Sequence, residues 1–242
     1  MTPWLNDTYV LFVIESKRFT RQAAIFVINS LIAAAVFFLF RLAADPPPQV
    51  ELRLLAGAIV FGVAMQSINA TGQIMVSERF EGQMKLFRTS SISQASYVVA
   101  VTIFSAATAA MTALVVLGLA AAAGVHLSLS PLLIPLIVLT ALALPGFAVL
   151  IATHAKTAQA GYMLSNAVGI MLVMISPIFY PIDRLPEPLQ WLARLSPFTH
   201  AGQAIHETLS GGTAIIVPVC ILLAFTVGAN AIGIAKMRWR EP

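Results

Sequence analysis

The strongest constraint in this sequence is a series of uninterrupted apolar blocks, each about 20 residues long. A helix rises 1.5 Å per residue, so about 20 residues span a hydrocarbon core of roughly 30 Å. Lipid offers no hydrogen bonds to the backbone, which favours helices because they satisfy their own polar groups. The blocks predict an all-α membrane protein with six transmembrane helices, at residues 23–40, 54–76, 95–123, 131–153, 158–181 and 214–235.

Composition excludes a water-soluble protein. Of the 242 residues, 59% are hydrophobic and 10% are charged, against about 25% charged in an average soluble domain. The net charge of +4 does not indicate a nucleic-acid partner, because the basic residues sit at the ends of apolar blocks, where they contact lipid headgroups. The single Cys220 allows no intrachain disulfide and no multi-cysteine metal site.

The positions of lysine and arginine predict the orientation. Ten of the fourteen basic residues fall on one side of the predicted spans: Lys17, Arg18, Arg21, Arg79, Lys85, Arg88, Lys156, Lys236, Arg238 and Arg240. The other side has Arg41, Arg53, Arg184 and Arg194. The positive-inside rule therefore predicts a multi-pass protein of the cytoplasmic (inner) membrane with both termini in the cytoplasm.

The N-terminal segment, residues 1–22, is amphipathic but too polar to span. Its apolar face is predicted from residues near helical spacing, Leu5, Tyr9, Phe12 and Phe19, and its polar face from Glu15, Arg18 and Gln22. We expect an interfacial helix on the cytoplasmic surface. An ordinary water-exposed cap helix is the alternative.

The loop between the second and third spans, residues 77–92, is also patterned. Phe80, Met84 and Phe87 fall at i, i+4 and i+7. A charged stripe follows another face: Glu81, Lys85 and Arg88. The pattern predicts a short cytoplasmic helix parallel to the membrane that docks a partner, with a plain interfacial loop as the alternative.

The sequence lacks the charged residues inside spans that ion-coupled carriers use, and it lacks common catalytic motifs. The interiors of the six predicted spans hold no Asp, Glu, Lys or Arg, which argues against an ion-coupled carrier. The sequence also contains no phosphate-binding glycine loop, zinc-protease pair or nucleophile elbow. The chain is therefore not predicted to be an enzyme, and active transport would need an energy source on another chain.

Uncharged polar residues remain in the spans. Gln66, Asn69 and Gln73 form a stripe along the second span, and Asn166 and Asn230 are isolated. Amides at such positions either join helices by hydrogen bonds or line a polar translocation path. The candidate path residues are Gln66, Asn69, Gln73 and Asn166.

An external segment, residues 182–212, is punctuated by prolines that would open or close short helices. We expect these helices to re-enter the outer leaflet. The candidate site residues of this segment are Pro197, Phe198, His200 and Glu207, together with Tyr180, which lies just before it. His200 and Glu207 lack a third ligand, so no metal site is predicted.

The order of these parts, with two motifs, resembles the type 2 ABC exporter permeases, a family that includes bacterial drug, lipid and polysaccharide exporters. The motifs are Glu78-Arg79 followed by Gly82, and Ser-Pro-Ile-Phe-Tyr-Pro at 176–181 with Ser-Pro-Phe-Thr-His at 196–200. The resemblance covers nearly the whole chain and implies one domain, 1–242, with these parts: interfacial helix 1–22, spans 23–76, coupling loop 77–92, spans 95–181, external segment 182–212, last span 214–235 and tail 236–242.

The resemblance also implies partners. Two permease subunits, identical or paralogous, would pair, and separate ATPase subunits carrying ATP and Mg would dock on the coupling loop, while this chain binds no cofactor. The residues implied in docking are Glu78, Arg79, Glu81, Gly82, Lys85, Phe87 and Arg88. Gln83 and Lys85 depart from the Thr and Glu common in the family, which points to a specialised ATPase. The expected substrate is amphipathic or hydrophobic, a drug, lipid or lipid-linked glycan, and a passive channel or lipid-scaffolding protein is the alternative.

Overall fold

The computed structural model describes residues 3–21, 23–90, 92–128 and 130–237, and these residues contain helices and no strand. Within that range six helical segments are long and apolar enough to cross a membrane, which confirms the predicted number. They are α2 (Ala23–Ala44), α3 (Pro48–Phe80), α5 (Gln94–Ala122), the pair α6 (Leu133–Leu142) and α7 (Pro145–His154), α8 (Ala158–Ile175) and α11 (Ile216–Lys236). The remaining helices are α1 (Pro3–Arg21), α4 (Gln83–Thr89), the 3-10 turn η1 (Ile182–Arg184), α9 (Glu187–Leu195) and α10 (Pro197–Leu209).

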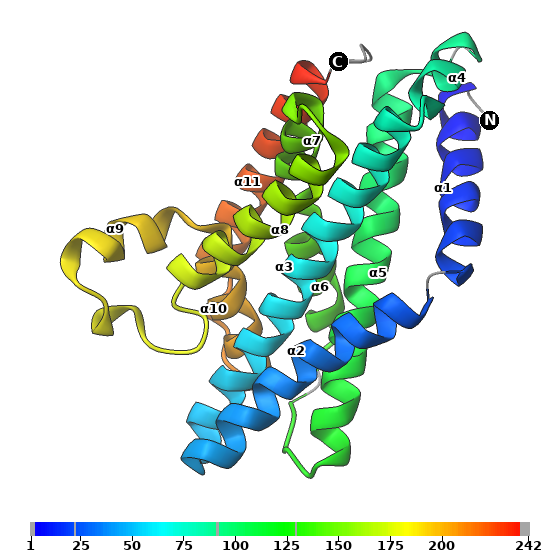
Figure 1. The fold of residues 1–242 in the computed structure, drawn as a ribbon. Helices are drawn as coiled ribbons and strands as arrows, with labels where there is room; N and C mark the ends of the chain where they lie inside the picture. Colours follow the sequence, from blue (N-terminus) through cyan, green and yellow to red (C-terminus); the bar gives the residue numbers. More distant parts are fainter. Residues whose placement is uncertain (1–2, 22, 91, 129, 238–242) are drawn as a thin grey trace.

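Helix α3 is the centre of the bundle, and it packs against α2, α5, α6, α7, α8 and α10. The start of α1, helix α4, the α7–α8 connection and the end of α11 lie at one end of the bundle (Figure 1). The α2–α3 and α5–α6 connections lie at the opposite end. The connections thus alternate between two ends, as six spans require, and we name the first of these ends the α4 end.

The first two spans are longer than predicted, since α2 extends to Ala44 and α3 covers Pro48–Phe80, and two later spans are interrupted or shorter. The fourth, predicted as residues 131–153, is broken between Leu142 and Pro145, because proline has no N–H to continue the helix. The Nδ2 of Asn230 donates to the carbonyl of Leu142 at 2.8 Å, which satisfies one backbone group at the break. The fifth, predicted to reach residue 181, ends at Ile175, since Ser176 precedes a proline and is extended.

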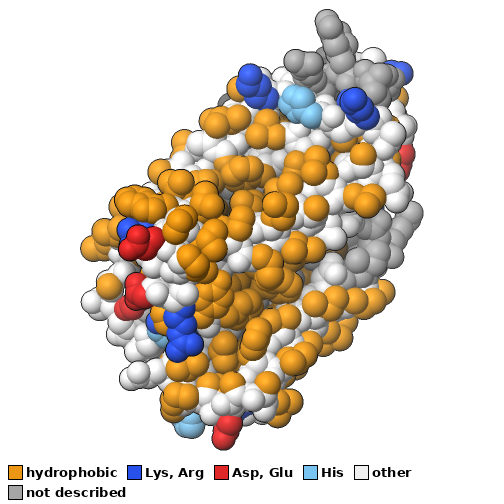
Figure 2. Space-filling view, turned by 60° about the vertical axis from the view of Figure 1, so that its left-hand side comes forward, with side chains coloured by type: hydrophobic (Ala, Val, Ile, Leu, Met, Phe, Trp, Pro, Cys, Tyr) orange, Lys and Arg blue, Asp and Glu red, His pale blue; other side chains and the backbone are white. Residues whose placement is uncertain are grey.

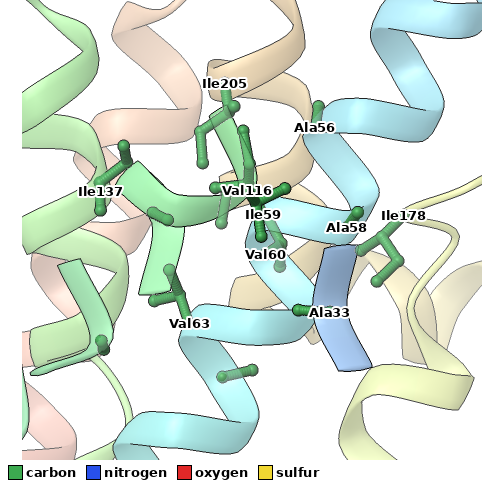
Figure 3. Packing of buried hydrophobic residues seen from close by; sticks show 14 of the residues in the cluster. Ala33, Ala56, Ala58, Ile59, Val60, Val63, Val116, Ile137, Ile178 and Ile205 are labelled. Atoms are coloured by element: carbon green, nitrogen blue, oxygen red, sulfur yellow. The ribbon is translucent and has the colours of Figure 1, made fainter. Parts of the chain in front are cut away.

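The core is built from small and branched residues of several helices (Figure 3). Ala33 of α2 and Ile59 of α3 are fully buried there, and Val116 of α5 lies in the same cluster. A Cβ added at Gly62 would come within 2.8 Å of the Ala33 Cβ, so the glycine allows α2 and α3 to approach closely. Small residues serve this purpose in membranes, where helices gain nothing by hiding apolar surface from lipid.

Hydroxyl groups join the helices across the same core. The Oγ of Ser67 on α3 donates to the carbonyl of Ala141 on α6 at 2.7 Å. The Oγ1 of Thr71 donates to the Oγ of Ser105 on α5 at 2.8 Å. These bonds are interhelical and buried, as is common between membrane helices.

The outer surface is largely apolar. Figure 2 shows hydrophobic side chains over most of one face, with lysine and arginine at its upper end and a mixed group of basic and acidic side chains at its left edge. Large exposed side chains of α8 are Tyr162, Met163, Leu164, Ile170, Met171, Met174 and Ile175. Such a surface suits lipid rather than water.

Candidate functional site

The α3–α4 elbow, residues 78–89, bends at Gly82. Helix α3 continues to Phe80, and α4 begins at Gln83. Gly82 has a φ of 77°, a left-handed conformation that glycine adopts without a steric penalty. The sequence predicted one short helix here, and the structure shows the end of a long helix joined to a separate short one.

The apolar residues of the elbow pack inward. Met84 is buried, and Phe80 and Phe87 pack partly buried against the same cluster of α1, α3, α5 and α7 residues. The ring of Phe87 lies 5.6 Å from that of Tyr97, measured between centroids. On the other face Glu81, Lys85 and Leu86 are exposed, Leu86 by 68%. The side chain of Arg88 lies outside the described part of the structure.

Arg79 is directed into the bundle. Its Nη1 donates to the carbonyls of Ala152 and Ala155, at 2.6 and 3.0 Å. These carbonyls belong to the last turn of α7 and the residue that ends it, where backbone acceptors lack helical partners and a positive charge is favoured. Arg79 therefore fixes α3 to α7 instead of facing a partner protein.

Glu78 is fully buried in a polar network that joins four helices. The Nη1 of Arg18 on α1 donates to the Oε1 of Glu78 at 3.0 Å and to the Oε1 of Glu15 at 3.1 Å. The Nη2 of Arg18 donates to the Oε1 of Gln83 on α4 at 3.0 Å. The Tyr97 hydroxyl of α5 donates to the Oε2 of Glu78 at 2.5 Å. Of the predicted docking residues, Glu78 and Arg79 thus act as internal anchors of the elbow.

Glu15 shares one arginine with Glu78. Burial of its carboxyl group, together with the nearby Glu78 charge, raises the pKa of Glu15 to about 8, and Arg18 only partly opposes this shift. Two buried carboxyl groups share a single guanidinium group here, so the pair retains one proton at neutral pH.

Of the predicted polar face of α1, Glu15 and Arg18 contact other helices, and Gln22 lies outside the described residues. Thr8, Leu11 and Glu15 are the residues that face inward, while Leu5 and Tyr9 are exposed. Helix α1 lies alongside the part of α5 nearest to α4 (Figure 1), and its Phe residues meet Phe104 of α5 edge to face. The amphipathic pattern correctly predicts a helix, and the polar face of this helix packs against other helices of the same chain.

A cleft of about 640 Å³, here called the polar cleft, opens beside this network. It is lined by Glu15, Arg18 and Phe19 of α1, Phe26 and Asn29 of α2, Gln66, Asn69, Ala70, Gln73, Ile74 and Ser77 of α3, Glu81, Phe104 of α5 and Tyr162 of α8.

The predicted amide stripe forms one wall of the polar cleft. Gln66, Asn69 and Gln73 all line it. Gln66 is 8% exposed, and its Oε1 has no hydrogen-bond partner. Asn166 is exposed on α8 and is not among the lining residues. The structure thus brings together three of the four predicted path residues, and it adds Glu15, Arg18 and Asn29, whose inward position no helical pattern indicated.

The external residues are mostly buried. Pro197, Phe198 and His200 are buried, and Tyr180 and Glu207 are partly exposed. The Nε2 of His200 lies 2.8 Å from the carbonyl of Arg194 at the end of α9, so the ring supports the α9–α10 junction. Within the described residues no group of three metal-binding side chains occurs.

Helix α9 presents an apolar face outward. Trp191 and Leu195 are 69% and 71% exposed, and Leu189 and Leu192 are exposed beside them. Helix α10 instead packs against α3, α6 and α11. The two halves of the external segment therefore have different environments.

The fold and cleft define a multi-pass helical membrane protein whose polar cavity adjoins the elbow between two of its helices. The model of the ABC-2 type transporter family matches residues 6–209. The chain therefore belongs to the ABC-2 type transporter family, whose members are membrane components of transporters and usually work with ATP-binding subunits. No curated protein matches the chain significantly.

Proposed function

We propose that the chain is the permease subunit of an ATP-driven exporter, energised by a separate ATP-binding subunit that docks on the α3–α4 elbow. The observation that carries this proposal is the construction of the elbow. Its inner residues are anchored to several helices, and its outer face remains exposed.

The anchors would allow a movement of α4 to be transmitted to α3 and the helices bonded to it. Glu78 connects α3 to α1 and α5, and Arg79 connects α3 to α7. A displacement of α4 would therefore move α3 as a rigid element, together with its cleft-lining Gln73. ATP binding and hydrolysis on the partner would supply that displacement. By family resemblance, a second permease copy or a paralogue completes the transporter.

The polar cleft supports an amphipathic or hydrophobic substrate, such as a drug, a lipid or a lipid-linked glycan. Its walls combine aromatic rings with amides, the mixture typical of sites that bind molecules with apolar and polar parts. Such a substrate would reach the cleft beside α1 from the cytoplasmic leaflet, where it partitions at the interface. The excess of basic residues at the α4 end supports a cytoplasmic position for that end, in the inner membrane.

The test is the effect of changes on the outer face of α4. Lys85→Glu and Leu86→Asp should reduce co-purification of an ABC ATPase, identified by mass spectrometry, and lower ATP-dependent transport at least fivefold. Lys156→Glu is the control, because Lys156 is exposed at the same end in the α7–α8 connection. All three variants should reach the membrane at wild-type amounts. Wild-type transport by both α4 variants would rule out docking at the elbow.

A further inference from the structure

The end of the polar cleft nearest to α4 carries an excess of acidic groups. Among the described lining residues the charged ones are Glu15, Arg18 and Glu81, and Glu78 lies directly behind Arg18. The guanidinium group of Arg18 thus contacts the carboxyl groups of Glu15 and Glu78, and the Glu81 carboxyl group lines the same cleft without contacting it. The local charge is negative, even though the chain as a whole is positive.

Arg18 is not available to an anionic ligand. Its Nη1 donates to both oxygens of Glu15, at 3.1 and 3.4 Å, and to Glu78, while its Nη2 donates to Gln83. Binding an anion would require Arg18 to give up carboxylate partners that are themselves buried, which leaves charges uncompensated.

A second feature of the cleft favours a positively charged ligand independently. Aromatic rings of Phe19, Phe26 and Phe104 lie nearby, with centroid distances of 5.2 Å for Phe19–Phe26 and 5.9 Å for Phe19–Phe104. Ring faces attract cations as well as apolar groups.

We propose that the polar cleft binds an organic cation with an apolar body, whose charge lies next to Glu15 and Glu81 and whose body contacts the aromatic walls. The proposal rests on the proposed function, since it names the substrate class of the same cleft. The proposal adds that the amphipathic substrate carries a positive charge.

Binding of a cation should displace a proton from Glu15. The groups that face Glu15 are Arg18 on its own helix, Glu78 of α3 and Tyr97 of α5, and Glu81 and Tyr162 line the same cleft. With the pKa of Glu15 at about 8, its carboxyl group is mostly protonated at pH 6 and mostly ionised at pH 9. Affinity for a cation should therefore rise between these two pH values, because ionisation adds a negative charge beside it.

The experiment measures equilibrium binding of two probes of similar shape and opposite charge, tetraphenylphosphonium and tetraphenylborate. The full chain is reconstituted in nanodiscs without nucleotide, and binding to empty nanodiscs is subtracted. Tetraphenylphosphonium should bind saturably and several-fold more tightly at pH 9 than at pH 6, and tetraphenylborate should show no saturable binding.

Three variants locate the site. Glu15→Gln should leave phosphonium binding unchanged at pH 6 and abolish the pH dependence, so that binding at pH 9 weakens by the same several-fold factor. Glu81→Gln should weaken binding at both pH values. Glu187→Gln, an exposed change in α9 away from the cleft, should have no effect.

Equal or tighter binding of tetraphenylborate, absence of phosphonium binding, or wild-type binding by both Glu15→Gln and Glu81→Gln would overturn the inference. No ATPase subunit is present, so these results are separate from the docking test. Wild-type transport by both α4 variants, with intact cation binding, would refute docking at the elbow alone, and transport of only neutral or anionic molecules would refute the cationic substrate alone.

Discussion

At the scale of single residues, the α4 end depends on charged side chains that are buried together. A carboxylate inside a protein is costly unless hydrogen bonds and an opposite charge compensate it. Glu78 is compensated by Arg18 and the Tyr97 hydroxyl. Glu15 must share the same Arg18, so one carboxyl group of the pair keeps a proton near neutral pH.

This sharing predicts a pH-dependent stability. The pKa of Glu15 rises from 4.5 to about 8 on folding. The folded state therefore binds the proton more tightly, and this contribution to stability is complete below pH 4.5 and is lost as pH rises to about 8. Relative to wild type, Glu15→Gln should leave the thermal unfolding midpoint nearly unchanged at pH 4 and raise it by several degrees at pH 9. Glu81→Gln, an exposed change, is the control, and a wild-type pH profile in Glu15→Gln would contradict the assignment.

At the scale of elements, the bundle relies on places where two helix backbones nearly touch. A Cβ added at Gly146 of α7 would collide with the backbone of Ala229 on α11 and lie 2.8 Å from the Asn230 nitrogen. A Cβ added at Gly233 would lie 3.2 Å from the Gly146 Cα. This approach brings Asn230 to the carbonyl of Leu142, where the fourth span is broken.

Gly146→Ala should therefore force α7 and α11 apart. Overpacking of this kind costs about 2 kcal/mol, and separation would also lengthen the Asn230–Leu142 hydrogen bond. We expect the thermal unfolding midpoint in detergent to fall by several degrees. Gly228→Ala, also on α11, is the matched control, because a Cβ there meets nothing within 4 Å. Equal midpoints for the two variants would show that the close approach is not required.

At the scale of the whole molecule, the fold places its connections at two opposite ends. The α4 end contains the start of α1, the elbow, the α7–α8 connection and the end of α11 (Figure 1). At the other end, the Nε of Arg41 lies 2.6 Å from the Oε1 of Glu51, and its Nη1 donates to the carbonyl of Ala123. Arg41 thereby ties together the ends of α2, α3 and α5, even though it belongs to the less basic side.

This arrangement predicts the accessibility of each connection. Reporter fusions in whole cells should alternate outside, inside, outside, inside, outside, inside, because six spans with cytoplasmic termini require it. The fusion points are Asp45, Thr89, His126, Lys156, Ser210 and Lys236. An external signal at Thr89 would invert the topology and remove the elbow from any cytoplasmic ATPase.

The sequence by itself determined the features that depend on local composition and period. Block length determined the number of spans, since the bilayer thickness sets how many apolar residues a helix needs. Helical spacing correctly placed Met84 and Phe87 on one inward face of α4 and Gln66, Asn69 and Gln73 in one stripe of α3. Both inferences require only the 3.6-residue turn of a single helix.

Only the tertiary structure decided which polar helix faces pack against other helices of the chain. Arg18 and Glu78 are 60 residues apart in sequence, and the polar face of α1 gave no sign that it would pack against α3 and α5 instead of water. Glu78 and Arg79 looked like part of an exposed docking motif, yet their partners come from α1, α5 and α7. Asn166 resembled the other amides but lies on the exposed side of α8. A buried charge is stable only through partners brought close by packing, and a helical pattern carries no information about where those partners lie.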